Sequence, residues 1–276
     1  MLGLIDVGGG NRGAFGAGVM DYFLDNGIVT DYCIGVSAGS ANCASYIAGQ
    51  KGRNLRFYTY YNVSDEAVSL KNRITKHSFL DLDYIFSTVS NEDGVDPLDY
   101  HSFVKSPQDF HVVATDAKTG RPVYFDKGDL KENDYRMLSA SCNIPGINKE
   151  YRIGDAGYYD GGLADPIPLE KAFRDGCDKV IVVLTLPKDY FRDDRRDRKL
   201  ARLVRSHPEI KQAVINRSSL YNSKLVAALQ YEKEGKVLII SPKTKPDMDI
   251  LGKDTKEINR IYNEGYSNAS AATSFI

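Results

Sequence analysis

The sequence of 276 residues contains no tryptophan, only four cysteines and no long hydrophobic run. The cysteines lie far apart without any C-x-x-C spacing, which argues against a disulfide framework and against a zinc site. No stretch approaches the roughly 18 apolar residues of a membrane-spanning helix, and the first residues lack the basic segment of a signal peptide. We therefore expect reduced cysteines, no bound metal and a cytoplasmic location, compatible with transient contact with a membrane surface.

An excess of charge of either sign is also lacking. The sequence has 36 Lys and Arg residues against 37 Asp and Glu residues, so its formal net charge is −1 and nucleic acid is not expected as a partner. There is no internal repeat, low-complexity segment or flexible linker, which favours a single domain over residues 1–276. We interpret the charge-rich residues 192–205 as a solvated helix face rather than a site for anionic lipid head groups.

The first fifty residues predict two consecutive strand–helix units. Apolar strands are expected at Leu2–Val7 and Asp31–Val36, and helices at Ala14–Asn26 and Ser40–Ala48, with glycines at the turns. This repeated pattern is typical of an α/β fold in three layers, with a mainly parallel sheet and helices on both of its faces.

The rest of the chain is less regular. Residues 53–106 are expected to form helices and loops rich in Tyr and Phe, and the aromatic residues at 57–61 and 79–86 either line or cap an acyl pocket or pack in the core. In the middle of the chain we expect a hairpin of Phe110–Thr115 and Pro122–Phe125, a helix at Lys131–Cys142, a short strand at Gly157–Tyr159 and a central strand at Lys179–Thr185. The part over about 190–276 should be mostly helical, with a strand at Val237–Ser241 and a helix at Glu257–Ala272.

Residues Gly35–Gly39 (GVSAG) fit the pattern G-x-S-x-G between a predicted strand and a predicted helix. A serine on such a sharp turn projects its hydroxyl above the sheet, where it can act as a nucleophile. The helix N-terminus behind it offers free N–H groups and a positive potential for developing negative charge. The alternative is an ordinary strand–helix turn in which Ser37 merely caps the helix.

Residues Gly8–Gly13 (GGGNRG) form a second glycine loop between a strand and a helix, a setting that suits anion binding. They also fit the dinucleotide fingerprint G-x-G-x-x-G. That fingerprint requires an acidic residue at the end of the second strand, whereas Asp31 opens this strand and Gly35–Gly39 occupies its end. We expect no cofactor, and both loops should lie side by side at the carboxyl edge of the sheet.

Asp160-Gly161-Gly162 adds an acid after the short strand near Tyr159. With the serine turn and the glycine loop, it completes a set of nucleophile, base and N–H donors. In this order, G-G-G-x-R-G, G-x-S-x-G and D-G-G resemble the three sequence blocks of patatin-like phospholipases.

The resemblance extends over residues 2–187 and is only loose in the C-terminal third. Residues Ser139–Pro145 are similar to the small-residue block of that family, although Cys142 and Asn143 replace its usual alanines. The stretch Asp165–Glu170, followed by a strand, is similar to its bacterial members.

The resemblance implies a serine acyl hydrolase that cleaves a lipid ester through an acyl-serine intermediate. Phospholipid, lysophospholipid and neutral lipid all fit as substrates. Ser37 would be the nucleophile and Asp160 the sole general base. The oxyanion hole would be formed by backbone N–H groups of Gly8, Gly9, Gly10 and Ala38. Around it, the supporting motif residues would be Arg12, Gly13, Gly35, Gly39, Gly161 and Gly162.

Two other functions are open to the sequence. The order Ser37, Asp160, His207 would suit an α/β-hydrolase esterase with a catalytic triad. However, His207 lies in a charged stretch directly before Pro208, and only one strand–helix unit precedes the serine turn. His77, His101 and His111 are not expected to be catalytic. The second alternative is a non-catalytic module that binds a lipid or a dinucleotide.

Overall fold

The computed structural model describes residues 1–75, 78–204 and 207–276. In these residues, eight strands form one sheet in the order β5-β6-β3-β2-β1-β7-β8, and β4 pairs with β3. The five parallel strands are β1 (Leu2–Asp6), β2 (Tyr32–Val36), β3 (Asp109–Asp116), β7 (Lys179–Val183) and β8 (Val237–Ile240). The antiparallel edge consists of β4 (Pro122–Asp126), β5 (Tyr151–Ile153) and β6 (Ala156–Asp160). The mainly parallel sheet and the hairpin of β3 and β4 confirm the sequence prediction.

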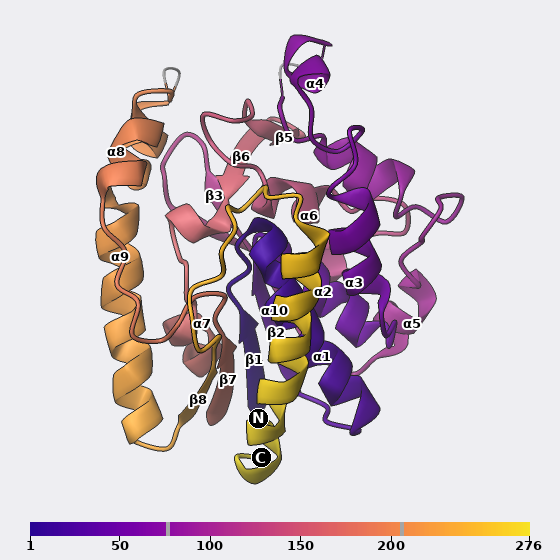
Figure 1. Ribbon diagram of the computed structural model, residues 1–276, viewed down its shortest axis with the longest axis vertical. Helices are drawn as coiled ribbons and strands as arrows, with labels where there is room; N and C mark the ends of the chain where they lie inside the picture. Colours follow the sequence, from indigo (N-terminus) through magenta and orange to yellow (C-terminus); the bar gives the residue numbers. More distant parts are fainter. Residues whose placement is uncertain (76–77, 205–206) are drawn as a thin grey trace.

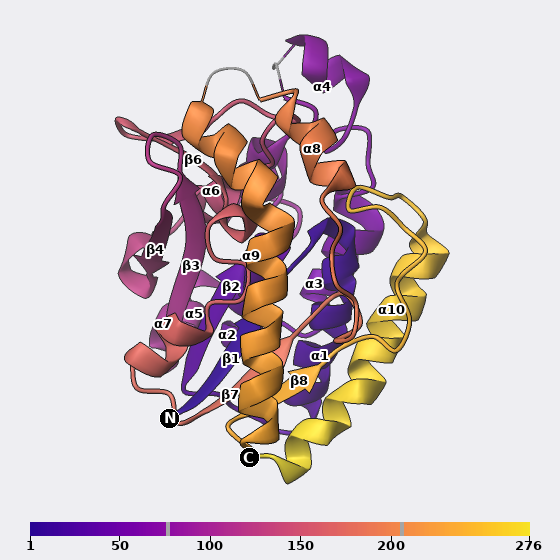
Figure 2. The same cartoon turned by 90° about the vertical axis from the view of Figure 1, so that its left-hand side faces the viewer.

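Helices cover both faces of the sheet, which completes the three layers. One face carries α1 (Ala14–Asp25) and α2 (Ala38–Ile47), with α10 (Thr255–Asn268) packed outside α1, and the opposite face carries α7 (Leu169–Arg174) and α9 (Pro208–Lys233) (Figure 1). The long helix α9 runs along its face of the sheet (Figure 2). The shorter helices are α3 (Arg53–Arg56), α4 (Leu70–Thr75), α5 (Tyr100–Lys105), α6 (Arg136–Ser141) and α8 (Arg195–Ala201).

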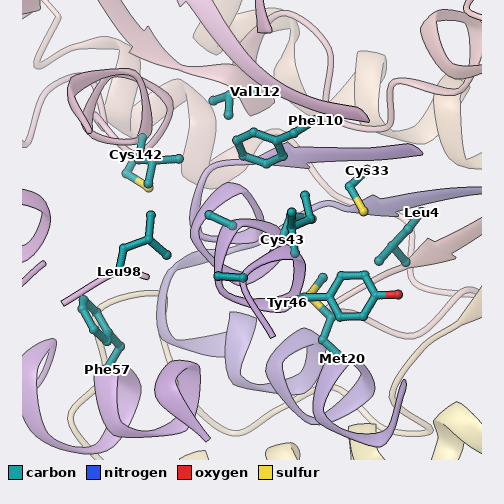
Figure 3. Packing of buried hydrophobic residues seen from close by; sticks show 14 of the residues in the cluster. Leu4, Met20, Cys33, Cys43, Tyr46, Phe57, Leu98, Phe110, Val112 and Cys142 are labelled. Atoms are coloured by element: carbon teal, nitrogen blue, oxygen red, sulfur yellow. The ribbon is translucent and has the colours of Figure 1, made fainter. Parts of the chain in front are cut away.

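Alternating side chains of the central strands supply two separate cores, as expected for a sheet buried on both faces. Leu4, Cys33 and Phe110 point toward the α1–α2 side, while Ile5, Ile34 and Val113 belong to the core beneath α7 and α9. Figure 3 shows the first core, in which the strand residues meet side chains of the helices: Leu4, Cys33, Phe110, Val112, Met20, Cys43 and Tyr46. All four cysteines are buried and unpaired.

The C-terminal part contributes to the same sheet. Strand β8 pairs with β7, and Tyr221, Leu225 and Ala228 of α9 pack in the second core. We therefore propose that residues 1–276 form a single domain. Among the described residues, none of the helices combines the length and the apolar character that crossing a bilayer requires.

Two predicted helices differ from the observed ones. The helix predicted at Lys131–Cys142 is only Arg136–Ser141, because Lys131 and Asp134 form a bridge and Asn133 adopts a positive φ of 58°. The helix predicted at Glu257–Ala272 begins at Thr255, where the Asp254 carboxylate accepts the N–H groups of the first turn. After Asn268 it continues as a 3-10 helix, Ala269–Ser274.

Candidate active site

Ser37 lies on a sharp turn between β2 and α2. Its backbone adopts φ 54° and ψ −133°, a conformation that strains a residue with a side chain. Its N–H donates to the Ser141 hydroxyl at 2.8 Å, and that hydroxyl donates to the Val113 carbonyl at 2.6 Å. The Ser37 carbonyl accepts the Ser40 hydroxyl at 2.7 Å. The strained turn is therefore held at both its N–H and its C=O.

The glycine loop lies directly against this turn. A Cβ on Gly8 would lie 2.3 Å from the Val36 carbonyl oxygen and 2.7 Å from the Gly39 nitrogen, so only a glycine permits this approach. As expected, the two loops lie side by side at the carboxyl ends of β1 and β2. Ala38, the first residue of α2, adds a helix-terminal N–H that points away from its own helix.

The N–H groups of the glycine loop are not equivalent. The N–H of Gly8 donates to Asp6 Oδ1 at 2.9 Å, so the prediction of an oxyanion donor at Gly8 is wrong. In the part of the chain that the structure describes, the N–H groups of Gly9 and Gly10 donate to no protein acceptor. The loop thus offers two free donors rather than three.

The C-terminal part holds the other side of the loop. The Asn11 N–H donates to the Ile250 carbonyl at 2.7 Å, and Asn11 Nδ2 donates to the Gly252 carbonyl at 2.9 Å. A Cβ on Gly10 would lie 2.1 Å from the Ile250 oxygen. Residues 250–252 therefore fix the glycine loop from a position 240 residues further along the chain.

Asp160 ends β6 and begins the turn Gly161–Leu163. Its Oδ1 accepts the Gly162 N–H at 2.8 Å, its backbone N–H donates to the Asn143 carbonyl, and its carbonyl accepts the Thr115 hydroxyl. The carboxyl group is buried and lines the same cavity as Ser37. Burial raises the pKa of Asp160 above its ordinary value of 3.8, and the positive charge of Arg217 acts in the opposite direction.

Ser37 lies between two cavities. One contains Asp160, Gly9, Gly10 and Arg12. The other is mainly apolar, and its lining includes Phe57, Tyr58, Leu82, Ile85, Phe86 and Leu251. Of the aromatic residues that the sequence suggested for an acyl pocket, Phe57, Tyr58 and Phe86 line this apolar cavity, whereas Tyr60 is largely exposed.

The described histidines lie elsewhere. His101 pairs with Glu132 at 3.4 Å, His111 lies 4.0 Å from Asp175, and His207 pairs with Glu150 at 3.2 Å. None of these three lines either cavity at Ser37, and His77 lies outside the described residues.

A dinucleotide site would require an acidic residue at the end of β2, but this described strand ends at Val36 and is followed by Ser37. Asp31 precedes β2 and accepts the Leu2 N–H at 2.7 Å, at the opposite end of the strands. This position disfavours a dinucleotide in the glycine loop.

The sequence interpretation missed Asp6, which supports both loops. Its Oδ1 accepts the Gly8 N–H, and its Oδ2 accepts Asn42 Nδ2 at 2.8 Å. Asn42 also donates to the Gly13 carbonyl and accepts the Tyr58 hydroxyl. Burial raises the pKa of Asp6 to about 6. A charged residue at the end of an otherwise apolar strand was the available signal for this role.

A sequence model described as patatin-like phospholipase matches residues 7–173, which is more than half of the chain. The chain belongs to the patatin-like phospholipase family. Residues 207–274 of this patatin-like chain match a second family model, described as a domain of unknown function.

Similar proteins include the "Uncharacterized protein YjjU" of Escherichia coli, 28% identical over 195 residues, and the "Uncharacterized NTE family protein MT2641" of Mycobacterium tuberculosis, 27% identical over 189 residues. The matches cover 69% and 66% of this chain, but only 53% and 30% of the relatives. A solved structure of VipD from Legionella pneumophila aligns with 99% of this chain and 66% of its own, with 12% identity and a TM-score of 0.49.

Proposed function

We propose that this patatin-like chain is a serine acyl hydrolase in which Ser37 attacks a lipid ester and Asp160 serves as the sole general base. Membership in the family supports lipid hydrolysis, and the arrangement of the two residues supports this choice of dyad. Ser37 and Asp160 are far apart in the sequence, yet both line one cavity, and the Ser37 side chain acts to lower the pKa of the Asp160 carboxyl. Their place in the same cavity is the observation that carries the proposal.

In the acylation step, Asp160 accepts the Ser37 hydroxyl proton while the serine oxygen bonds to the ester carbonyl carbon. The N–H groups of Gly9, Gly10 and Ala38 stabilise the negative charge on the carbonyl oxygen. The C–O bond to the leaving alcohol then breaks, and the alcohol takes the proton from Asp160. In the deacylation step, Asp160 accepts a proton from water, which attacks the acyl-serine, and the serine recovers its proton as the fatty acid leaves.

The apolar cavity supports a lipid as the substrate. Ser37 lines this cavity together with apolar side chains such as Phe57, Phe86 and Leu251. An acyl chain can therefore bury its methylenes in the cavity while its carbonyl remains at the serine. Phospholipids, lysophospholipids and neutral lipids share this acyl part.

Labelling with a fluorophosphonate probe tests the proposed function directly. We expect a stoichiometric covalent adduct on Ser37, because Asp160 activates its hydroxyl. The readout is intact-protein mass spectrometry followed by peptide mapping, with Ser223→Ala on the exposed side of α9 as a control that should still be labelled. A folded protein that forms no adduct at Ser37 would instead favour the non-catalytic binding module.

The pH dependence of hydrolysis tests the base. Asp160 must be ionised to accept a proton, and burial raises its pKa, so activity should fall as the pH decreases through a value above 3.8. The measurement is kcat/KM against pH, with circular dichroism to verify folding.

Asp6 titrates nearby, with a pKa of about 6, so Asp6→Asn provides the control. The acidic limb should persist in this variant. If the limb disappears with Asp6, or if the wild-type rate stays constant down to pH 4, Asp160 is not the base.

A further inference from the structure

Three arginines converge on the cavity that contains Ser37 and Asp160. Arg12 comes from the glycine loop, Arg192 from the segment after β7, and Arg217 from α9. Tyr221 lines the same cavity one helical turn after Arg217. The sequence interpretation of residues 192–205 as a solvated helix face holds for Arg195, Arg196 and Arg198 of α8, which are exposed, but it is wrong for Arg192. Arg205 lies outside the described residues.

The hydrogen-bond donors of Arg217 and Tyr221 have few acceptors among the described residues. Asp160 is the only acidic residue among the described residues that line this cavity. Arg217 lies 3.7 Å from Asp197, and its buried Nε has no hydrogen-bond acceptor in the described chain. The buried Tyr221 hydroxyl likewise has no partner there. A buried donor without an acceptor costs free energy, which an incoming anion would recover.

The arginines are also held in place. The Arg192 guanidinium carbon lies 3.8 Å from the centre of the Tyr221 ring. The Asn222 side chain accepts the Arg192 backbone N–H through Oδ1 and donates to the Arg192 carbonyl through Nδ2. Burial and the charge of Arg217 lower the pKa of Arg192 to about 10. The cluster is therefore a fixed, mutually repelling set of cations beside the serine, which is typical of a site built for an anion.

The two cavities meet at Ser37, Gly10 and Ile144. An ester carbonyl at Ser37 thus has apolar space on one side and the cationic cluster on the other. Building on the proposed function, we propose that Arg192, Arg217 and Tyr221 form a subsite for the phosphate of a glycerophospholipid, supplied by the part of the chain after the matched family domain. Arg12 borders this subsite from the glycine loop.

The arginines have one competing role, which is to keep Asp160 ionised. Loss of Arg217 would then raise the pKa of Asp160 and slow the hydrolysis of every ester equally. A phosphate subsite, by contrast, affects only substrates that carry a phosphate. The ratio of activities on two matched substrates separates these roles.

The test compares kcat/KM for 1-oleoyl-lysophosphatidic acid and 1-oleoylglycerol at the pH plateau of each variant. In Arg217→Gln and Arg192→Gln, the ratio of phosphate to neutral substrate should fall roughly 10- to 100-fold, as expected for a lost hydrogen bond to a charged group. Tyr221→Phe, which removes only an unpartnered hydroxyl, should lower the ratio by a smaller factor. Arg198→Gln on α8, outside both cavities, is the matched control and should leave the ratio unchanged.

An unchanged ratio in folded Arg217→Gln and Tyr221→Phe would overturn the proposal. So would an equal loss on both substrates with a shifted acidic limb, which would assign the arginines to Asp160. If inorganic phosphate inhibits 1-oleoylglycerol hydrolysis as strongly as the lysophospholipid does, the site binds free phosphate and the head-group subsite is refuted.

If the wild-type protein cleaves neither ester, the proposed function fails. The phosphate subsite is then tested separately, by measuring the affinity for the lysophospholipid. Calorimetric titration of 1-oleoyl-lysophosphatidic acid should then show at least tenfold weaker binding to Arg217→Gln than to wild type. Equal affinity would overturn the subsite.

Discussion

Ser37→Ala should abolish ester hydrolysis in a protein that still folds, and Asp160→Asn should do the same. The first change removes the nucleophile, and the second replaces the base by a neutral group of the same shape. We expect kcat to fall by a factor on the order of 10⁴ or more in each variant. Because the two residues act in one proton transfer, the double variant should be hardly less active than either single variant. The measurement is steady-state hydrolysis of a chromogenic ester and of a lysophospholipid.

Single alanine variants of His77, His101, His111 and His207 are the controls for this experiment. Each should retain kcat within a small factor of wild type, since the described histidines lie outside both cavities at Ser37. A folded histidine variant as inactive as Ser37→Ala would refute the dyad and restore the triad. Melting curves identify any variant that loses activity by unfolding.

Gly8→Ala should strongly destabilise the protein. The new Cβ would lie 2.3 Å from the Val36 carbonyl oxygen, and the residue must keep φ +61°. The left-handed backbone and the steric overlap together cost about 2–5 kcal/mol. We expect Tm to fall by roughly 10 °C and hydrolysis to be lost, because the glycine loop must move away from the serine turn.

Gly27→Ala is a matched control for Gly8→Ala. Gly27 has nearly the same backbone angle, φ +64°, but a Cβ there meets nothing within 4 Å. The free energy of unfolding of Gly27→Ala should fall only by the cost of the left-handed backbone, about 1–2 kcal/mol. The variant should keep full activity per folded molecule. If both variants melt at the same temperature, the close contact between the loops does not contribute to stability.

The strand–helix units and both loops could be predicted because their signals are local. An apolar strand, a glycine turn and an amphipathic helix lie within thirty residues of one another, and parallel strands bring their carboxyl ends to one edge. The position of Asp160 could be inferred only from the family resemblance, because its proximity to Ser37 depends on the pairing of β6 with β3.

The residues that were missed act through contacts distant in sequence. Ser141 binds the Ser37 N–H across 104 positions, and no pattern near Ser141 indicates this partner. Arg192 lies in a charged stretch, where composition indicates solvent exposure, and the sequence around Arg217 contains no pattern that indicates a binding site. Only the packing of α9 against the sheet turns Arg217 toward the serine. The helix forecast at Lys131–Cys142 was too long because propensity does not show the left-handed turn at Asn133.

The contact of Ile250 and Gly252 with the glycine loop makes the support of this loop depend on synthesis of the chain as far as Gly252. During translation, the serine, the aspartate and the glycine loop leave the ribosome well before residues 250–252, which supply the carbonyl acceptors for Asn11. A nascent chain that ends after β7 thus contains Ser37, Asp160 and the glycine loop but not the carbonyl acceptors for Asn11. In a chain cleaved between β8 and Ile250, the residues that hold the glycine loop would likewise no longer be covalently continuous with it.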